Sequence, residues 1–413
     1  MLKMADDRNG RRPSWTTTVA MSLLHVGIAA AVPATDSRFL VGGHGGVAMS
    51  FDLEHDAPRL EPGSAEARAH LAEHGYAVLA SVLNETELRT ARELLWRFME
   101  GTRKGIRRAD PRTWHRIGPN QFGIVWNSGA GQSELMWHVR SAPRLLEFFS
   151  SFWGVGRAEL LTSFEGFGVM PPTELESSWG ALAEGWFHTD QNGASRPGLW
   201  TVQSFTSLHD QDETTGAFVV VPGSHLEHAA VTRRALRAAP GTPRTQQFLL
   251  VPPDDSILTA RRPRLIRCRA GDAVVWDSRT VHCNTPPLTR EVPWRPTVER
   301  QSGMARGSFG PDGSALPSPP LEPHPPNFPD FLRVVAYVSM APRARATPAV
   351  LLARRRAVLN AQACTHWPFE ATCVPPDDEL PPPPDLGELQ LDLAGLSAED
   401  GALIAAARRA ATA

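Results

Sequence analysis

Histidine and carboxylate side chains are the residues of this sequence best suited to chemistry, since its 413 residues include 14 histidines. His188 and Asp190 are separated by one residue. Side chains at positions i and i+2 of a strand point to the same face. Two histidines and one carboxylate on one face of an octahedron hold non-haem iron and leave positions open for other ligands. His188 and Asp190 could therefore supply two such ligands, and a more distant histidine the third.

The same spacing occurs a second time, at His225 and Glu227. This pair follows residues 221–224, Val-Pro-Gly-Ser, where a strand end runs into a turn, and that context favours a structural histidine. The candidate third ligand is His282. It follows a turn, the apolar strand expected at residues 273–276 and a polar exit from that strand. His282 is therefore expected at the end of a core strand, where it could point inward.

The elements that must position these residues are short strands. Apolar runs separated by Gly, Pro, Asn and Asp are typical of an antiparallel sandwich or barrel. The expected strands are residues 160–170, 199–208, 216–221, 248–251 and 273–276, followed by a last strand at 331–340.

Helices are expected around this β region. Asn84 and Glu87 have the capping-box spacing and begin an amphipathic helix that extends to about Glu100. The other expected helices are residues 64–74, ended by Gly75, residues 143–153, and residues 347–361. In the last of these, Arg354, Arg355 and Arg356 are expected to form a solvated face.

With these blocks identified, the sequence resembles the phytanoyl-CoA dioxygenase (PhyH) family of Fe(II)/2-oxoglutarate oxygenases. The matching pieces, in the family's order, are residues 186–191, residues 215–225 with their Pro-Gly-Ser-His end, residues 271–284, and an N-terminal piece from His74 through the helix at Asn84. The resemblance covers about residues 66–345. It implies a mainly β fold with flanking helices (α+β), a double-stranded β-helix, or cupin-like jelly-roll, of two facing sheets.

The resemblance also implies a site. His188, Asp190 and His282 match the family's iron ligands. The family holds 2-oxoglutarate partly through an arginine on the last core strand, which corresponds to Arg333. That residue lies farther from His282 than is usual in the family. The alternative is Arg295, which is closer to the usual spacing but lies in a Pro-Trp-Arg-Pro segment that is not strand-like.

Further contacts to the co-substrate are expected from Asn284, Gln203 and Phe205, whereas Cys283 is expected to be a core thiol. The implied cofactor is Fe(II), with 2-oxoglutarate as co-substrate and O2 as oxidant. The implied reaction is hydroxylation of a small molecule with release of succinate and CO2. Related halogenases lack the carboxylate ligand, so the presence of Asp190 favours hydroxylation. Two alternatives stay open: a non-catalytic jelly-roll that binds a metal or ligand, and a cupin-type metalloenzyme that does not use 2-oxoglutarate.

Composition excludes several other functions. The net charge of −2 gives no electrostatic case for binding nucleic acid or anionic lipid. Lys3 and Lys104 are the only lysines, and neither lies in a phosphate-binding loop; a Gly-x-Ser-x-Gly nucleophile elbow is also missing. Cys364 and Cys373 could close a small loop or remain two thiols. The substrate and the oligomeric state stay open.

Three regions are expected along the chain. Residues 1–61 are a disordered leader or a targeting segment, whose apolar run is too short and polar for a membrane span. Residues 62–373 are the oxygenase domain, with a Pro-rich insertion at 286–330. Residues 374–413 are a Pro-rich linker and tail. An intracellular location is expected, with a targeting role left open for the N-terminal segment.

Overall fold

A computed structural model describes residues 40–42, 48–50, 52, 56–119, 123–170, 172, 186–285, 287, 330–375 and 381–412. Arg295, most of the expected insertion and most of the expected leader lie outside these residues. In the ranges given, no helix combines the length and the apolar character needed to cross a membrane.

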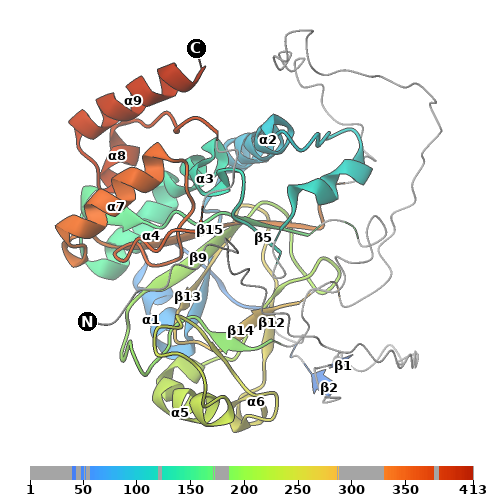
Figure 1. Ribbon diagram of the computed structural model, residues 1–413. Helices are drawn as coiled ribbons and strands as arrows, with labels where there is room; N and C mark the ends of the chain where they lie inside the picture. The colour runs from blue at the N-terminus through green and yellow to red at the C-terminus, as the bar shows by residue number, and fades with distance from the viewer. Residues whose placement is uncertain are drawn as a thin grey trace, which may run out of the picture. The chain divides into compact units, whose positions relative to one another are not determined.

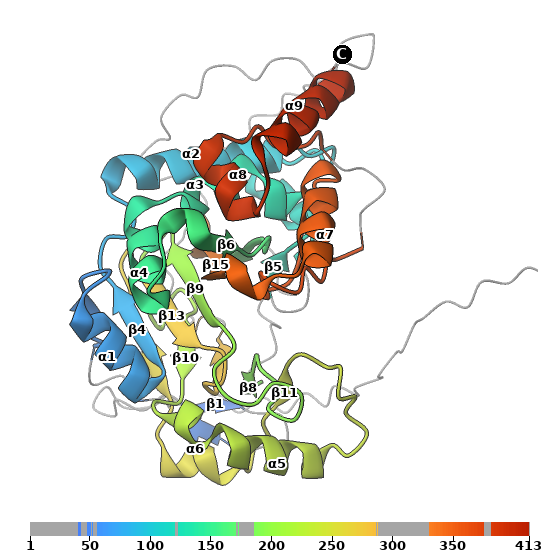
Figure 2. The same ribbon diagram turned by 90° about the vertical axis from the view of Figure 1, so that its left-hand side faces the viewer.

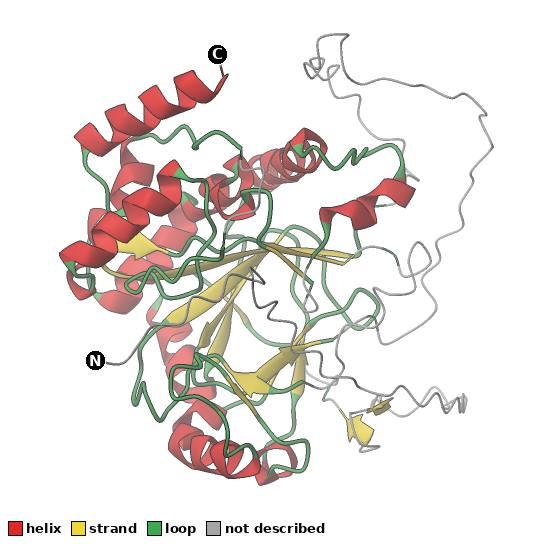
Figure 3. Ribbon diagram, in the orientation of Figure 1, coloured by secondary structure: helices red, strands yellow, loops and turns green. Residues whose placement is uncertain are grey.

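Two largely antiparallel sheets occupy the centre of the fold (Figures 1 and 3). The larger contains, in spatial order, β3 (Arg59–Leu60), β4 (Tyr76–Leu79), β13 (Ala273–Asp277), β9 (Val202–Ser207), β15 (Arg333–Pro342), β7 (Phe167–Met170) and β5 (Ile124–Val125), while β6 (Leu160–Thr162) also pairs with β15. The smaller contains β11 (Leu249–Leu250), β8 (His188–Thr189), β14 (His282–Asn284), β10 (Phe218–Val220) and β12 (Arg264–Ile266). A separate pair is β1 (Leu40–Gly42) with β2 (Ala48–Ser50). The predicted architecture of two facing sheets is confirmed.

Helices flank the sheets on both outer sides. Figure 2 shows α5 and α6 beside the strands β8 and β11, and α3, α4, α7 and α8 on the far side of the larger sheet. The helices are α1 (Ala65–His74), α2 (Glu85–Gly101), α3 (Glu134–Arg140), α4 (Pro143–Trp153), α5 (His228–Ala238), α6 (Ser256–Ala260), α7 (Pro348–Leu359), α8 (Glu388–Ala394) and α9 (Ala398–Thr412).

Alternation along the strands separates an inner core from an outer one. On β15, Val335 and Tyr337 pack between the sheets with Phe205 of β9 and Phe218 of β10. The alternate residues of β15, Val334, Ala336 and Val338, pack outward in the core beneath the helices. Since side chains alternate along a strand, Arg333 and Ser339 share the inner face of β15 with Tyr337.

Two helix ends have the capping residues that the sequence predicts. The Asn84 side chain accepts hydrogen bonds from the main-chain N–H groups of Thr86 and Glu87, and the Glu87 carboxylate accepts one from the Asn84 N–H. The predicted capping box is therefore confirmed. An N-cap of this kind typically stabilises a helix by about 1 kcal/mol. Gly75 ends α1 with φ of 80°, a left-handed conformation that glycine adopts without steric cost.

The expectation that Arg354 is solvated was wrong. This residue keeps 1% of its surface exposed and donates to the main-chain oxygens of Thr162, Pro368, Leu393 and Ala394. A guanidinium has five N–H donors, so one side chain can satisfy several carbonyl groups that the ends of other elements leave unpaired. Of its two neighbours, Arg356 is exposed and Arg355 is partly exposed.

The C-terminal part of the chain packs on the larger sheet's outer side. A disulfide joins Cys364 and Cys373, which settles the alternative left open by the sequence. Beyond it, α8 contacts β6, and α9 contacts both α7 and α8. Two helices thus lie where the sequence suggested a linker and tail, while the domain boundaries themselves stay a prediction.

Candidate metal centre

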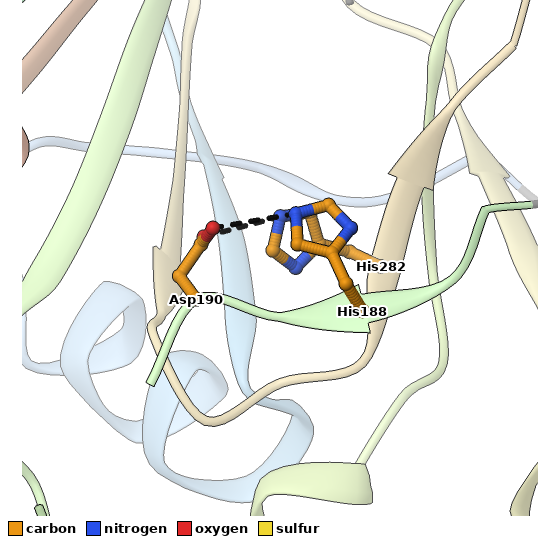
Figure 4. Close-up of side chains that lie close together, drawn as sticks. All are labelled: His188, Asp190 and His282. Atoms are coloured by element: carbon orange, nitrogen blue, oxygen red, sulfur yellow. Dashed lines mark ion pairs between the residues drawn. The ribbon is translucent and has the colours of Figure 1, made fainter. Parts of the chain in front are cut away.

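Three predicted ligands converge between the two sheets (Figure 4). His188 lies on β8, Asp190 directly follows that strand, and His282 begins β14, which pairs with β8 at His188. One ligand atom from each residue lies within 4.8 Å of the others. His188 Nε2 is 3.3 Å from Asp190 Oδ1, and His282 Nε2 is 3.2 Å from Asp190 Oδ2.

The histidines are held in the form that a metal requires. His188 Nδ1 lies 3.2 Å from the main-chain oxygen of Trp186, and His282 Nδ1 lies 2.9 Å from that of Thr280. Because a carbonyl oxygen only accepts, each Nδ1 carries the proton and each Nε2 keeps a free lone pair. Burial, followed by the charge of His282, lowers the pKa of His188, which favours its neutral form.

The carboxylate is held as firmly as the imidazoles. Gln203 Nε2 donates to Asp190 Oδ2 at 2.6 Å, and Trp276 Nε1 donates to the same oxygen at 3.0 Å. Burial raises the pKa of Asp190, but His282 and His188 together lower it more, so this pKa is held well below its usual value. An ionised carboxylate beside two imidazole Nε2 atoms fits a divalent metal such as iron.

A second polar group lies on the inner face of β15. Arg333 Nε donates to Gln211 Oε1 at 2.8 Å, and its Nη2 donates to Asn284 Oδ1 at 2.9 Å. The guanidinium lies 5.3 Å from the ring centroid of Phe205. Arg333 is 5% exposed. Burial lowers its pKa, and the described groups that oppose this effect are Tyr337 and Cys268, neither of them a carboxylate. The result is a buried cation with neutral partners, which is an unusual arrangement unless a ligand brings the counter-charge.

The structure thus distributes the predicted co-substrate residues between two places. Asn284 and Phe205 contact Arg333, as a shared site would require. Gln203 instead contacts Asp190 and supports the metal ligands. The roles of these residues toward a co-substrate stay predictions.

The alternative His-x-Glu pair is structural. His225 Nε2 lies 3.0 Å from the main-chain oxygen of Ala72, and Glu227 pairs with Arg261 at 2.8 Å. Cys283 is a buried free thiol whose pKa burial raises, in agreement with a core thiol.

Several residues of the site were missed from the sequence. Trp276 could have been found, because a tryptophan inside a short apolar strand next to the ligand His282 is a candidate for the inner face. Gln211 and Glu165 gave no such signal, since both lie outside regular strands. His366 is a further case. Burial lowers its pKa, and the charge and main chain of Asp190 raise it, which places His366 beside the metal centre.

Comparison with known proteins agrees with this geometry. Residues 180–290 match the model of the family described as Phytanoyl-CoA dioxygenase (PhyH). The resemblance to this family is confirmed. His188, Asp190 and His282 all lie inside the matched residues, whereas Arg333 lies beyond them. Together with the triad, the match supports an enzyme of the iron- and 2-oxoglutarate-dependent oxygenase type.

Individual relatives are distant. The "Ava biosynthesis cluster protein O" of Aspergillus versicolor is 26% identical over 186 residues, which is 43% of this chain and 58% of that protein. Among solved structures, the non-heme alpha ketoglutarate dependent carbocyclase SnoK from nogalamycin biosynthesis is 20% identical, with 55% of this chain and 79% of that one covered and a TM-score of 0.35. EvdO2 from Micromonospora carbonacea var. aurantiaca, complexed with 2-oxoglutarate, is 18% identical, with 69% and 91% covered and a TM-score of 0.35.

Proposed function

We propose that this protein is an Fe(II)- and 2-oxoglutarate-dependent oxygenase that hydroxylates a small organic substrate. The observation that carries the proposal is the pairing of two features in one interior. One is a triad of two buried imidazoles and an ionised carboxylate, and the other is a buried arginine without an acidic partner. The first fits iron and the second fits the distal carboxylate of 2-oxoglutarate.

Each residue has a defined task in this proposal. His188, Asp190 and His282 would hold the metal. Bound iron and 2-oxoglutarate would supply the oxidising chemistry with O2, with release of succinate and CO2. Arg333 would bind the co-substrate's distal carboxylate through its planar donors, and Asn284 fixes the direction of that guanidinium through its amide oxygen.

The chain's other residues orient the site and exclude water. Gln203 and Trp276 donate to the Asp190 carboxylate and would orient it toward the metal. His188 and His282 are 5% and 3% exposed, so the reaction would take place in an interior largely closed to solvent.

An anaerobic titration tests the proposal. Fe(II) and 2-oxoglutarate are added to the purified protein, and the visible charge-transfer band of the chelated keto acid is recorded. The band should form in the wild type, vanish in His188→Ala and weaken in Arg333→Ala. His115→Ala, at an exposed position, is the matched control and should behave as the wild type. A folded protein that gives no band would favour a non-catalytic or cupin-type protein instead.

A further inference from the structure

The chain carries one extra residue where β6 runs into β7. Thr162 pairs with Met340 of β15 and Phe167 pairs with Ala336, so the four residues 163–166 lie opposite only three, residues 337–339. Such a bulge redirects a side chain and is common beside active sites. Glu165 lies in this bulge.

The bulge brings Glu165 close to Ser339 and Gln203, and Gln203 holds a candidate metal ligand. Ser339 Oγ donates to Glu165 Oε2 at 3.1 Å, and Ser339 is paired with Gln203 across β15 and β9. Gln203 in turn donates to the carboxylate of Asp190. Side chains of directly paired residues are neighbours on one face of a sheet. Glu165 is therefore one cross-strand step from the residue that holds the metal ligand.

The two oxygens of the Glu165 carboxyl have different surroundings. Oε2 accepts from Ser163 Oγ at 2.8 Å as well as from Ser339. Oε1 has no hydrogen-bond partner among the described residues, and Glu165 keeps 7% of its surface accessible. Arg140, the buried cation nearby, donates to the main-chain oxygen of Glu165 and not to its side chain. One oxygen is thus saturated by neutral donors, and the other is available to a ligand.

Aromatic rings lie on the same inner face as Ser339, which bonds this carboxyl. Tyr337 and Phe205 lie 6.4 Å apart between their ring centroids, and Phe205 and Trp276 lie 6.0 Å apart. Aromatic faces attract cations and exclude anions. A carboxyl with a free oxygen among aromatic rings is suited to a cationic group on an otherwise apolar molecule.

We propose that Glu165 is the substrate-recognition residue of this site and that it binds a protonated amine on a small, mostly apolar substrate. The inference rests on the proposed function, because it names the substrate class of the same site. An ammonium group supplies N–H donors to the carboxyl and a positive charge that favours its ionised form, in addition to that of Arg140, which bonds the main-chain oxygen. An alcohol supplies a hydrogen bond only.

Three small molecules test the inference: benzylamine, benzyl alcohol and benzoate. They share a phenyl ring and differ in the charge of the polar group. Each is titrated into the metal-free protein and into the anaerobic Fe(II)/2-oxoglutarate complex, and binding is followed by tryptophan fluorescence. The variants are Glu165→Gln, which keeps the shape of the side chain, and Glu159→Gln, a control at an exposed carboxylate six positions earlier. Circular dichroism verifies that each variant is folded.

Benzylamine should bind most tightly of the three. Its Kd should rise at least about ten-fold in Glu165→Gln and stay unchanged in Glu159→Gln, since loss of a buried charge partner is costly. The inference is overturned if the wild type does not bind benzylamine, if it prefers benzoate, or if Glu165→Gln leaves the amine affinity within about two-fold. The charge-transfer band, recorded before any probe is added, judges the proposed function separately, because amine binding in the metal-free protein does not require it.

Discussion

Glu165→Gln offers a stability test of the buried carboxyl that needs neither metal nor substrate. Burial raises the pKa of Glu165 to about 7 from an ordinary value near 4.5. Hydrogen bonds from Ser163 and Ser339 and the charge of Arg140 lower it less, and the charge of Asp190 adds to the rise. Between these two pH values the folded protein keeps a proton that the unfolded chain has released. Stability is therefore lost as the pH rises through this window.

The size of the effect follows from the shift in pKa. At about 1.4 kcal/mol per pKa unit, the ionised carboxyl costs the folded state about 3 kcal/mol well above pH 7. Most of this, about 2–3 kcal/mol, accumulates between pH 5 and pH 8. Glutamine does not titrate. Between pH 5 and pH 8, the free energy of unfolding of Glu165→Gln should therefore rise by about 2–3 kcal/mol relative to that of the wild type.

Urea denaturation of the EDTA-treated proteins at pH 5, 6, 7 and 8 measures this difference directly. Metal is removed because a bound cation would itself favour the ionised carboxyl. Glu159→Gln serves as the control and should show a difference that varies much less with pH. The raised pKa would be refuted if the free energy of unfolding of Glu165→Gln, relative to that of the wild type, stayed constant across the four pH values. A decrease of this relative stability as the pH rises would refute it as well.

Three further outcomes are expected. Gln203→Leu removes a donor from the triad carboxylate and should weaken Fe(II) binding about 10- to 100-fold in an anaerobic titration, while far-UV circular dichroism stays the same; an unchanged affinity would contradict the supporting role. Arg354→Met leaves buried carbonyl groups unpaired and should cost on the order of 3 kcal/mol in urea denaturation. Arg356→Met, at an exposed position of the same helix, should stay within about 0.5 kcal/mol, and equal losses would count against the buried role. Reduction of the Cys364–Cys373 bridge should lower the free energy of unfolding by about 2–3 kcal/mol in the wild type and have no effect in the Cys364→Ser/Cys373→Ser double variant.

The metal centre could be predicted from sequence because its information is local. Alternation along a strand brings His188 and Asp190 to one side, and the apolar strand before His282 marks where the third side chain emerges. Arg333 was predicted from the resemblance to the family, whose arginine lies on the last core strand, and alternation along β15 explains why its side chain is on the inner face.

Other features depend on pairing between distant segments. The bulge that turns Glu165 inward is a shift of register between two strands, and neither strand's own sequence records it. Arg354 lies beside two other arginines on a helix and has the local pattern of a solvated face. Its carbonyl partners come from β6, from the disulfide-closed loop and from the end of α8, so only the assembled fold shows that it is buried.

The inner face of β15 has a polarity along its length. Arg333 stands at its first residue, and Ser339, bonded to the acidic Glu165, stands near its last. A dicarboxylic acid can satisfy the basic end, whereas Glu165, once ionised, would repel it from the opposite end. If both proposals hold, the two ends of the strand would bind ligands of opposite charge, and excess 2-oxoglutarate should compete poorly with the substrate above pH 7.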